Sequence, residues 1–290
     1  MNKGKSVLIN KRVVLFASMA MLFYSSVSLA ESAQPRIISA GNAVTELIYA
    51  LGAEQQLIAV DVTSHLPNES TLSKVGYHRQ LSAEGLIALN PTHLVGSNEM
   101  GPDSTLILLK QVGITVHVVN TEATIDGLLQ RVDQLAEITQ TQQNSRALKE
   151  SIKKSVAQLT RHQPSVSMQK KVLFLMIHEG RPANVAGKAT SADEIIRLAG
   201  AINPAAKALT SYKPLAMESL VAMQPDVILV SQRSMQKMGG IDAILATLPT
   251  LTATPAGKNR AVEVIDGAAL LGGLGLKSLA EAKRLNSLLY

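Results

Sequence analysis

The chain has 290 residues, no cysteine, 28 basic and 22 acidic side chains, and a formal net charge of +6. The lack of cysteine excludes disulfides, thiolate metal sites, a cysteine nucleophile and a lipidated cysteine anchor. Four of the basic residues lie in the first thirty positions, and without them 24 basic against 22 acidic residues leave +2. So small a charge gives no support to nucleic-acid binding.

The first thirty residues have the three parts of a secretory signal peptide. Basic residues precede an apolar stretch at 13–22, and small residues lead up to Ala30. We predict cleavage after Ala30 and export as a free protein to the periplasm of a Gram-negative cell. No other segment approaches the ~20 apolar residues of a membrane-spanning helix.

From residue 36 onward, the predicted strands and helices alternate. A strand at 36–39 leads to a helix around Glu46 that ends at Gly52. A second helix begins near Leu81, and an apolar strand follows Pro91. This order predicts parallel strands covered by helices.

The second half of the chain repeats this order. Residues 81–97 align without a gap with residues 215–231, and residues 46–53 resemble residues 194–201, which follow a predicted strand at 172–177. Short helix-proline-strand units also recur by chance in α/β proteins. Because two pairs recur in the same order, we predict two similar lobes instead.

Between the halves, residues 141–162 carry an apolar stripe at helical spacing. At about 1.5 Å per residue, this helix would be about 33 Å long. We therefore predict an α/β fold with two Rossmann-like lobes, each with a central parallel sheet, joined by one long helix. The predicted N-terminal lobe is 31–140, the linking helix 141–162 and the C-terminal lobe 163–290. Ligands bind such sheets at the carboxyl ends of the strands, so we expect the site between the lobes.

Common catalytic motifs are missing from the sequence. It contains no G-x-S-x-G, H-E-x-x-H or G-x-G-x-x-G, and its six histidines include no i, i+4 pair. The nearest approach to a phosphate loop is 272–278, where Leu276 stands at a position that the motif gives to glycine. We therefore expect a binding protein and not an enzyme.

Two tyrosines, Tyr77 and Tyr212, fall in loops expected at the cleft, each just ahead of a repeated helix. A phenol becomes an anionic ligand beside a Lewis acid or a positive charge, which Arg79 could supply. Ferric iron prefers oxygen anions, and a haem held by tyrosinate also needs cations for its propionates. Lys74 and Lys213 are further candidates for that role. Packing of Tyr77 on the lobe edge is the alternative.

A histidine ends the predicted strand at 172–177. His178 would enter the cleft opposite Tyr77 as a second axial ligand, although it could equally cap the strand. His78 is a weaker candidate for the iron. Met100 and Met235 are predicted to line the porphyrin pocket.

The segment 76–85, GYHRQLSAEG, carries the most specific match to a known family. Over nearly all of 36–290, the chain resembles the haemin-binding periplasmic proteins of haem ABC importers. They belong to the class III periplasmic binding proteins, a wider group that also binds cobalamin and ferric siderophores. The resemblance implies that Tyr77 binds the iron of ferric haem, that Arg79 steadies the tyrosinate or a propionate, and that His178 faces them.

The same resemblance gives a role to the repeated glutamates Glu84 and Glu218. It implies salt bridges with arginines of the inner-membrane permease, which works with an ATPase; each glutamate could also favour the first turn of its own helix. It further implies a monomer that receives haemin from an outer-membrane receptor. A cobalamin or siderophore carrier and a haem-degrading enzyme are the alternatives, and the number of bound haems, one or two, is left open.

Overall fold

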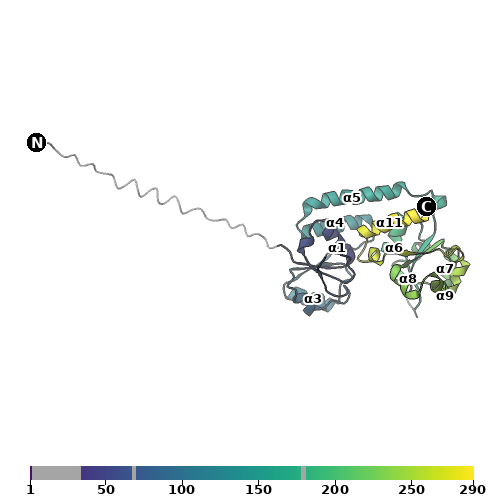
Figure 1. Cartoon of the computed structure of the whole chain (residues 1–290), viewed down its shortest axis with the longest axis horizontal. Coiled ribbons are helices and arrows are strands. Elements are labelled where there is room, and N and C mark those ends of the chain that lie inside the picture. The colour runs from purple at the N-terminus through teal and green to yellow at the C-terminus, as the bar shows by residue number, and fades with distance from the viewer. Residues whose placement is uncertain (2–33, 67–69, 178–180) are drawn as a thin grey trace. The chain divides into compact units, whose positions relative to one another are not determined.

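In a computed structural model, Met1 and residues 34–66, 70–177 and 181–290 are described. The predicted signal peptide beyond Met1 lies outside these described residues. Pro35–Tyr290 form one compact unit. It contains two five-stranded sheets flanked by helices (Figure 1).

The first sheet is parallel throughout, as predicted. Its strands are β1 (Ile37–Ala40), β2 (Leu57–Val60), β3 (Ser73–Lys74), β4 (His93–Gly96) and β5 (Thr115–Val118), in the spatial order β3-β2-β1-β4-β5. Its helices are α1 (Asn42–Ala50), α2 (Ala83–Ile87), α3 (Asp103–Gln111) and α4 (Ile125–Ile138). We call this part the first lobe. Chain order reverses between β1 and β4, and ligands of α/β sheets bind beside such a reversal.

The second sheet, which with its helices forms the second lobe, is mixed. Its strands are β6 (Val172–Met176), β7 (Asn184–Ala186), β8 (Tyr212–Pro214), β9 (Val227–Ser231) and β10 (Val262–Ile265), in the order β10-β9-β6-β7-β8. Its helices are α6 (Ser191–Leu198), α7 (Met217–Met223), α8 (Gln232–Met238), α9 (Ile241–Thr247) and α10 (Pro255–Lys258). The neighbouring strands β10, β9 and β6 are parallel, whereas β7 is antiparallel to both of its neighbours. The connection from β6 to β7 is shorter than the dozen or so residues of a parallel crossover, which explains this departure from the prediction.

One long helix carries the chain from the first lobe to the second, as predicted, and the C-terminal helix packs beside it (Figure 1). α5 (Gln142–Arg161) has 20 residues and packs on α4. α11 (Leu276–Leu289) packs on α6 and α5 and reaches α1 of the first lobe. None of the helices in the described ranges combines the length and the apolar composition of a membrane-spanning segment.

Alternating residues of the buried strands feed separate apolar cores. Ile37 of β1 and Val172 of β6 belong to one core, which also contains residues of α1, α4, α5, α6 and α11. Their neighbours point the other way. Ile38 lies in a core formed by the first lobe alone, and Leu173 lies in a core formed by the second lobe alone. We call the core that contains Ile37 and Val172 the shared core, because it is continuous across both lobes.

The repeat seen in the sequence corresponds to matching parts of the two lobes. Residues 81–97 form α2 and β4, and residues 215–231 form α7 and β9. β4 pairs with β1 as β9 pairs with β6. Asn90 and Gln224, each just before the repeated proline, both adopt a positive φ, 51° and 43°. The prediction of two similar lobes is confirmed.

The carboxylate of Glu46, on α1, makes the stability of the fold depend on pH. Burial raises its pKa from 4.5 to about 7, against the lowering effects of the Lys277 and Leu276 backbone N–H groups and of the charges on Lys277 and Arg131. Since the folded-state pKa is the higher one, the folded protein keeps a proton that the unfolded chain releases. Stability from this group is therefore greatest below pH 4.5 and falls as the pH rises to about 7.

We expect Glu46→Gln to raise the melting temperature at about pH 8 and to leave it nearly unchanged at about pH 4.5, because glutamine stays neutral throughout. Differential scanning calorimetry at the two pH values measures this difference. Glu54→Gln, an exposed change in the same lobe, is the control. An equal shift of Glu46→Gln at both pH values would contradict the prediction.

Candidate ligand-binding cleft

The two lobes face each other across a pocket of about 570 Å³. The first lobe contributes residues 97–99, which follow β4, and residues 121–124, which precede α4. The second lobe contributes residues 189–191 at the start of α6, and Ser211 and Tyr212. Leu270, Gly272 and Gly273, ahead of α11, complete the lining. Loops at strand ends and helix N-termini thus meet where the sheet topology predicts a ligand site.

A second groove, of about 720 Å³, runs along α5 and α11. All of its lining residues belong to these two helices or to His162. Since strand ends do not open into it, we place the candidate site in the pocket between the lobes.

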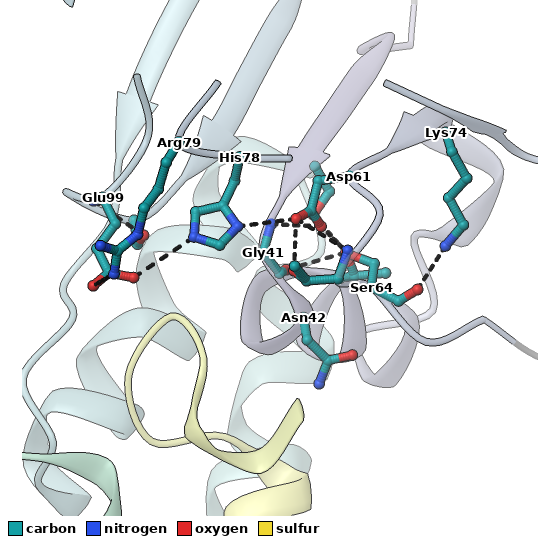
Figure 2. A network of polar contacts seen from close by, with 12 residues as sticks. Gly41, Asn42, Asp61, Ser64, Lys74, His78, Arg79 and Glu99 are labelled. Carbon is teal, nitrogen blue, oxygen red and sulfur yellow. Dashed lines mark hydrogen bonds and ion pairs between the residues drawn. The ribbon is translucent and has the colours of Figure 1, made fainter. Parts of the chain in front are cut away.

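A buried acid–histidine pair lies in the first lobe (Figure 2). Asp61 follows β2 and is fully buried, and its Oδ2 lies 3.0 Å from Nδ1 of His78, which is 1% exposed. Asp61 also accepts hydrogen bonds from the backbone N–H of Gly41 at 3.1 Å and from the hydroxyls of Thr63 and Ser64 at 2.6 and 2.7 Å. These donors hold both the carboxylate and the imidazole in place.

The charges of this pair support each other. Burial opposes ionisation of Asp61, but hydrogen bonds from His78, Thr63 and Ser64 outweigh it and lower the pKa to about 2. Burial also opposes the charge on His78, yet Asp61 and Glu99 raise the pKa of the imidazole. The ion-paired form is therefore favoured.

Glu99 extends this network to the pocket wall. Its Oε2 lies 3.6 Å from Nε2 of His78, and its Oε1 contacts the guanidinium of Arg79 (Figure 2). His78 lowers the pKa of Glu99, burial opposes this effect, and the charge of Arg79 adds to the lowering. Because Glu99 lines the pocket, the network that begins at buried Asp61 ends at the ligand site.

Tyr77 stands beside the network with a partly exposed phenol. Its side chain is 36% exposed, and its ring centroid lies 4.5 Å from that of His78 at a tilt of 59°. The backbone on either side is fixed, since Gln80 N donates to Tyr77 O at 2.8 Å and Gly101 N donates to His78 O at 3.0 Å. The structure therefore presents a partly exposed tyrosine on a hydrogen-bonded loop, outside the residues that line the pocket.

Tyr212 differs from Tyr77 in its surroundings. Burial, with a smaller effect from the charge of Glu99, raises the pKa of Tyr212 to about 12. Its ring packs edge-on against Phe174 at 6.2 Å. A phenol that holds its proton so firmly is a poor anionic ligand, so Tyr77 is the better candidate of the two.

The other predicted lining residues fall in different places. The Nζ of Lys74, on β3, donates to the carbonyl of Ser64 at 2.6 Å, and Lys213 is exposed on β8. Met235, on α8, packs partly buried against the core of the second lobe.

Met100 departs from its predicted place. It is 5% exposed and belongs to the core of the first lobe. Its sulfur lies against Gly96, where a Cβ would overlap it. The glycine of β4 thus makes room for Met100 inside the lobe, and Met100 is a core residue and not part of the pocket lining.

His178 lies outside the described residues, so its place opposite Tyr77 stays a prediction. Within the described ranges, no group of three or more histidine, aspartate or glutamate side chains could hold a metal ion.

Glu84 and Glu218 occupy matching positions. Each is exposed in the first turn of its helix, Glu84 in α2 and Glu218 in α7. One acidic side chain therefore projects from the same place on each lobe.

Sequence reasoning missed Asp61 and Glu99. Asp61 directly follows β2, and Glu99 comes three residues after the end of β4. Polar residues just beyond apolar strands are frequent in binding sites of such sheets, and this signal could have found both.

Two α/β lobes that face each other across a pocket, connected along one side, define a bilobal binding protein. Residues 37–269 match the model of the family described as periplasmic binding protein, and the chain belongs to this family. This membership agrees with the expectation of a binding protein and not an enzyme.

Three relatives illustrate the range of similarity. The crystal structure of the periplasmic heme-binding protein HutB of Vibrio cholerae is 58% identical, with a TM-score of 0.84, and the match covers 88% of this chain and 99% of that one. The heme-binding protein RhuT from Roseiflexus sp. RS-1, in apo form, is 32% identical, with a TM-score of 0.82 and coverage of 89% and 98%. A vitamin B12-binding protein of Vibrio parahaemolyticus serotype O3:K6 is 27% identical over 220 residues, 75% of this chain and 78% of that protein.

Proposed function

We propose that this protein binds ferric haem between its lobes in the periplasm and delivers it to an inner-membrane ABC importer. The observation that carries the proposal is the partly exposed phenol of Tyr77, whose ring packs against His78 in the network that reaches the pocket through Glu99. The 58% identity to a heme-binding protein supports the same cargo.

The residues around Tyr77 suit a ferric ligand. A ferric centre is a strong Lewis acid, and it favours the deprotonated phenol as a ligand. Arg79 is 51% exposed, so its guanidinium can turn from Glu99 toward the tyrosinate or a propionate. Lys74 and Lys213 lie at matching edge strands, where each could meet a propionate.

We assign His78 a supporting role and not that of an iron ligand. Both of its ring nitrogens face carboxylates, and the ring is 1% exposed. A ligand would have to displace Asp61 or Glu99 to reach it. His178 is therefore the better candidate for a second axial position or a second haem.

The Asp61–His78 pair should stabilise the protein before any cargo binds. We expect Asp61→Asn to lower the free energy of unfolding by about 3 kcal/mol at neutral pH, since it leaves a buried imidazolium without its counter-charge. Adding His78→Gln to Asp61→Asn should then have little further effect. Urea denaturation of Asp61→Asn, of His78→Gln and of the double variant measures this coupling.

The control for this cycle is Asp133→Asn, which removes an exposed ion pair to Lys149 and should not change stability measurably. Strictly additive losses for Asp61→Asn and His78→Gln would show that the two side chains act independently.

The delivery partners are also part of the proposal. Residues 1–30 would direct export, and a monomer would receive haemin from an outer-membrane receptor. Glu84 and Glu218 would then contact arginines of the permease. Two exposed carboxylates on lobes joined by a shared core keep a fixed spacing, which suits a partner built from two similar subunits.

A cobalamin carrier is the second candidate, favoured by the 27% identity to a vitamin B12-binding protein. A siderophore carrier is an alternative that the family resemblance alone allows. Neither cargo calls for a tyrosinate beside a guanidinium.

Absorption spectroscopy tests the choice of cargo. Purified protein is titrated with haemin, with cyanocobalamin and with a ferric siderophore in parallel. We expect saturable binding of haemin, with intact haem recovered after extraction. Binding of cobalamin or the siderophore alone would overturn the proposal, and conversion of haem to a degradation product would indicate an enzyme.

A further inference from the structure

The glycine-rich segment 272–275 has a structural role that a phosphate loop does not explain. It joins the short 3-10 helix at Gly267–Leu270 to α11, and Gly272 and Gly273 line the pocket. Its other side meets charged side chains of the first lobe.

One of these is Arg131, a fully buried cation of α4. Its guanidinium donates to the carbonyls of Leu274 and Asn120. A Cβ at position 273 would overlap Nη2 of Arg131, so glycine is required there for this close approach. Nη2 itself is buried without a hydrogen-bond partner among the described residues.

The second is Glu46, on α1. Its carboxylate accepts the backbone N–H of Lys277 at 3.2 and 3.4 Å, at the start of α11. A Cβ at Gly275 would overlap Oε1 of Glu46. Gly275 has φ −134°, which any residue can adopt, so the glycine is needed there for space and not for its conformation.

A neighbouring contact holds the same region. Asn42, at the start of α1, donates to the carbonyl of Ala268 at 3.4 Å. Side chains of three first-lobe residues thus hydrogen-bond to the backbone between residues 268 and 277, around the start of α11. The pocket wall at 272–273 is attached to the first lobe, although the preceding strand β10 belongs to the second.

We propose that Glu46 and Arg131 are positioning residues of the ligand cleft, which hold segment 272–275 against the first lobe and so fix one wall of the pocket. We call the hold of Glu46 and Arg131 on segment 272–275 the clamp. Its effect on haemin binding rests on the proposed function, whereas the clamp itself does not. Neither residue lines the pocket, so both act through the backbone that they hold.

Hydrogen–deuterium exchange of the ligand-free protein tests the clamp. Glu46→Ala should speed exchange of the Leu276 and Lys277 amides, whereas Glu46→Gln, which keeps an acceptor oxygen, should leave it slow. Gly275→Ala should also speed exchange, because its Cβ displaces the carboxylate. Combined with Glu46→Ala, it should add nothing further; the remaining contact with Ala43 Cβ, at 3.3 Å, is milder.

Equal exchange in Glu46→Ala and the wild type, or in Glu46→Ala and Glu46→Gln, would overturn the clamp. So would additive effects of Gly275→Ala and Glu46→Ala, because they would show that the two positions do not meet.

The rate of haemin dissociation tests the effect on the cleft. We expect Glu46→Ala and Arg131→Met to speed dissociation about tenfold, and Glu46→Gln to stay within about twofold of the wild type. Gly275→Ala supplies the same test if Arg131→Met does not fold. Unchanged dissociation despite faster exchange would refute the positioning role. Failure of the wild type to bind haemin would refute the proposed function instead. The clamp would then be tested by hydrogen–deuterium exchange alone.

Discussion

Replacing Tyr77 by alanine should abolish the charge-transfer band that tyrosinate-ligated ferric haem shows near the red end of the visible spectrum. We also expect haemin affinity to fall at least about 100-fold, because loss of even a second-sphere partner of a metal ligand lowers affinity by 10–100-fold. A haemin titration followed by absorption and by fluorescence quenching measures both effects.

Two further variants separate ligation from packing. Tyr77→Phe keeps the ring beside His78 and removes only the oxygen, so it should lose the band as fully as Tyr77→Ala. Tyr212→Phe is the matched control in the other lobe, since the pKa of Tyr212 is already raised to about 12 and its hydroxyl should not bind iron. A band that persists in Tyr77→Phe would rule out Tyr77 as the ligand.

Reversing the charges of Glu84 and Glu218 together should stop haem uptake while haemin binding stays unchanged. Both side chains are exposed in the first turns of α2 and α7. Lysine at these positions would repel the permease arginines that the family resemblance implies, and like charges in contact oppose docking. Growth of a haem-dependent strain on haemin, with the purified variant titrated in parallel, measures the two properties separately.

Glu54→Lys combined with Glu150→Lys makes the same charge change at two other exposed sites and should leave uptake intact. Each single reversal at Glu84 or Glu218 should reduce uptake partly. Normal growth of the double Glu84, Glu218 variant would remove the docking role without affecting the haem-binding proposal.

The repeat predicted the lobes because its signals are local. Helix, proline and strand follow each other within 17 residues in 81–97 and again in 215–231, and local order of this kind fixes the connections in parallel sheets. The antiparallel β7 escaped prediction, because its pairing depends on a short connection that periodicity does not reveal.

The site was less predictable, because its partners meet only after folding. Tyr77 and Arg79 stand together in the sequence, whereas Asp61 reaches His78 from 17 positions away and Glu99 reaches Arg79 from 20. Met100 is the opposite case. Its apolar side chain suggested a porphyrin contact, yet it packs in the core of the first lobe, in the space left by the missing Cβ of Gly96. The hydrogen bond from Arg131 to the carbonyl of Leu274 joins residues 143 positions apart, and no local sequence pattern predicts it.

The shared core determines how the pocket could widen. Swinging the lobes apart would pull side chains of α5 and α11 away from both sheets, and each 100 Å² of apolar surface exposed would raise the free energy by about 2.5 kcal/mol. On the proposed function, we therefore expect little affinity to be lost to closure of the lobes around haemin. By the same reasoning, we expect release of haemin to require that the proposed permease supply the free energy of separating the two lobes.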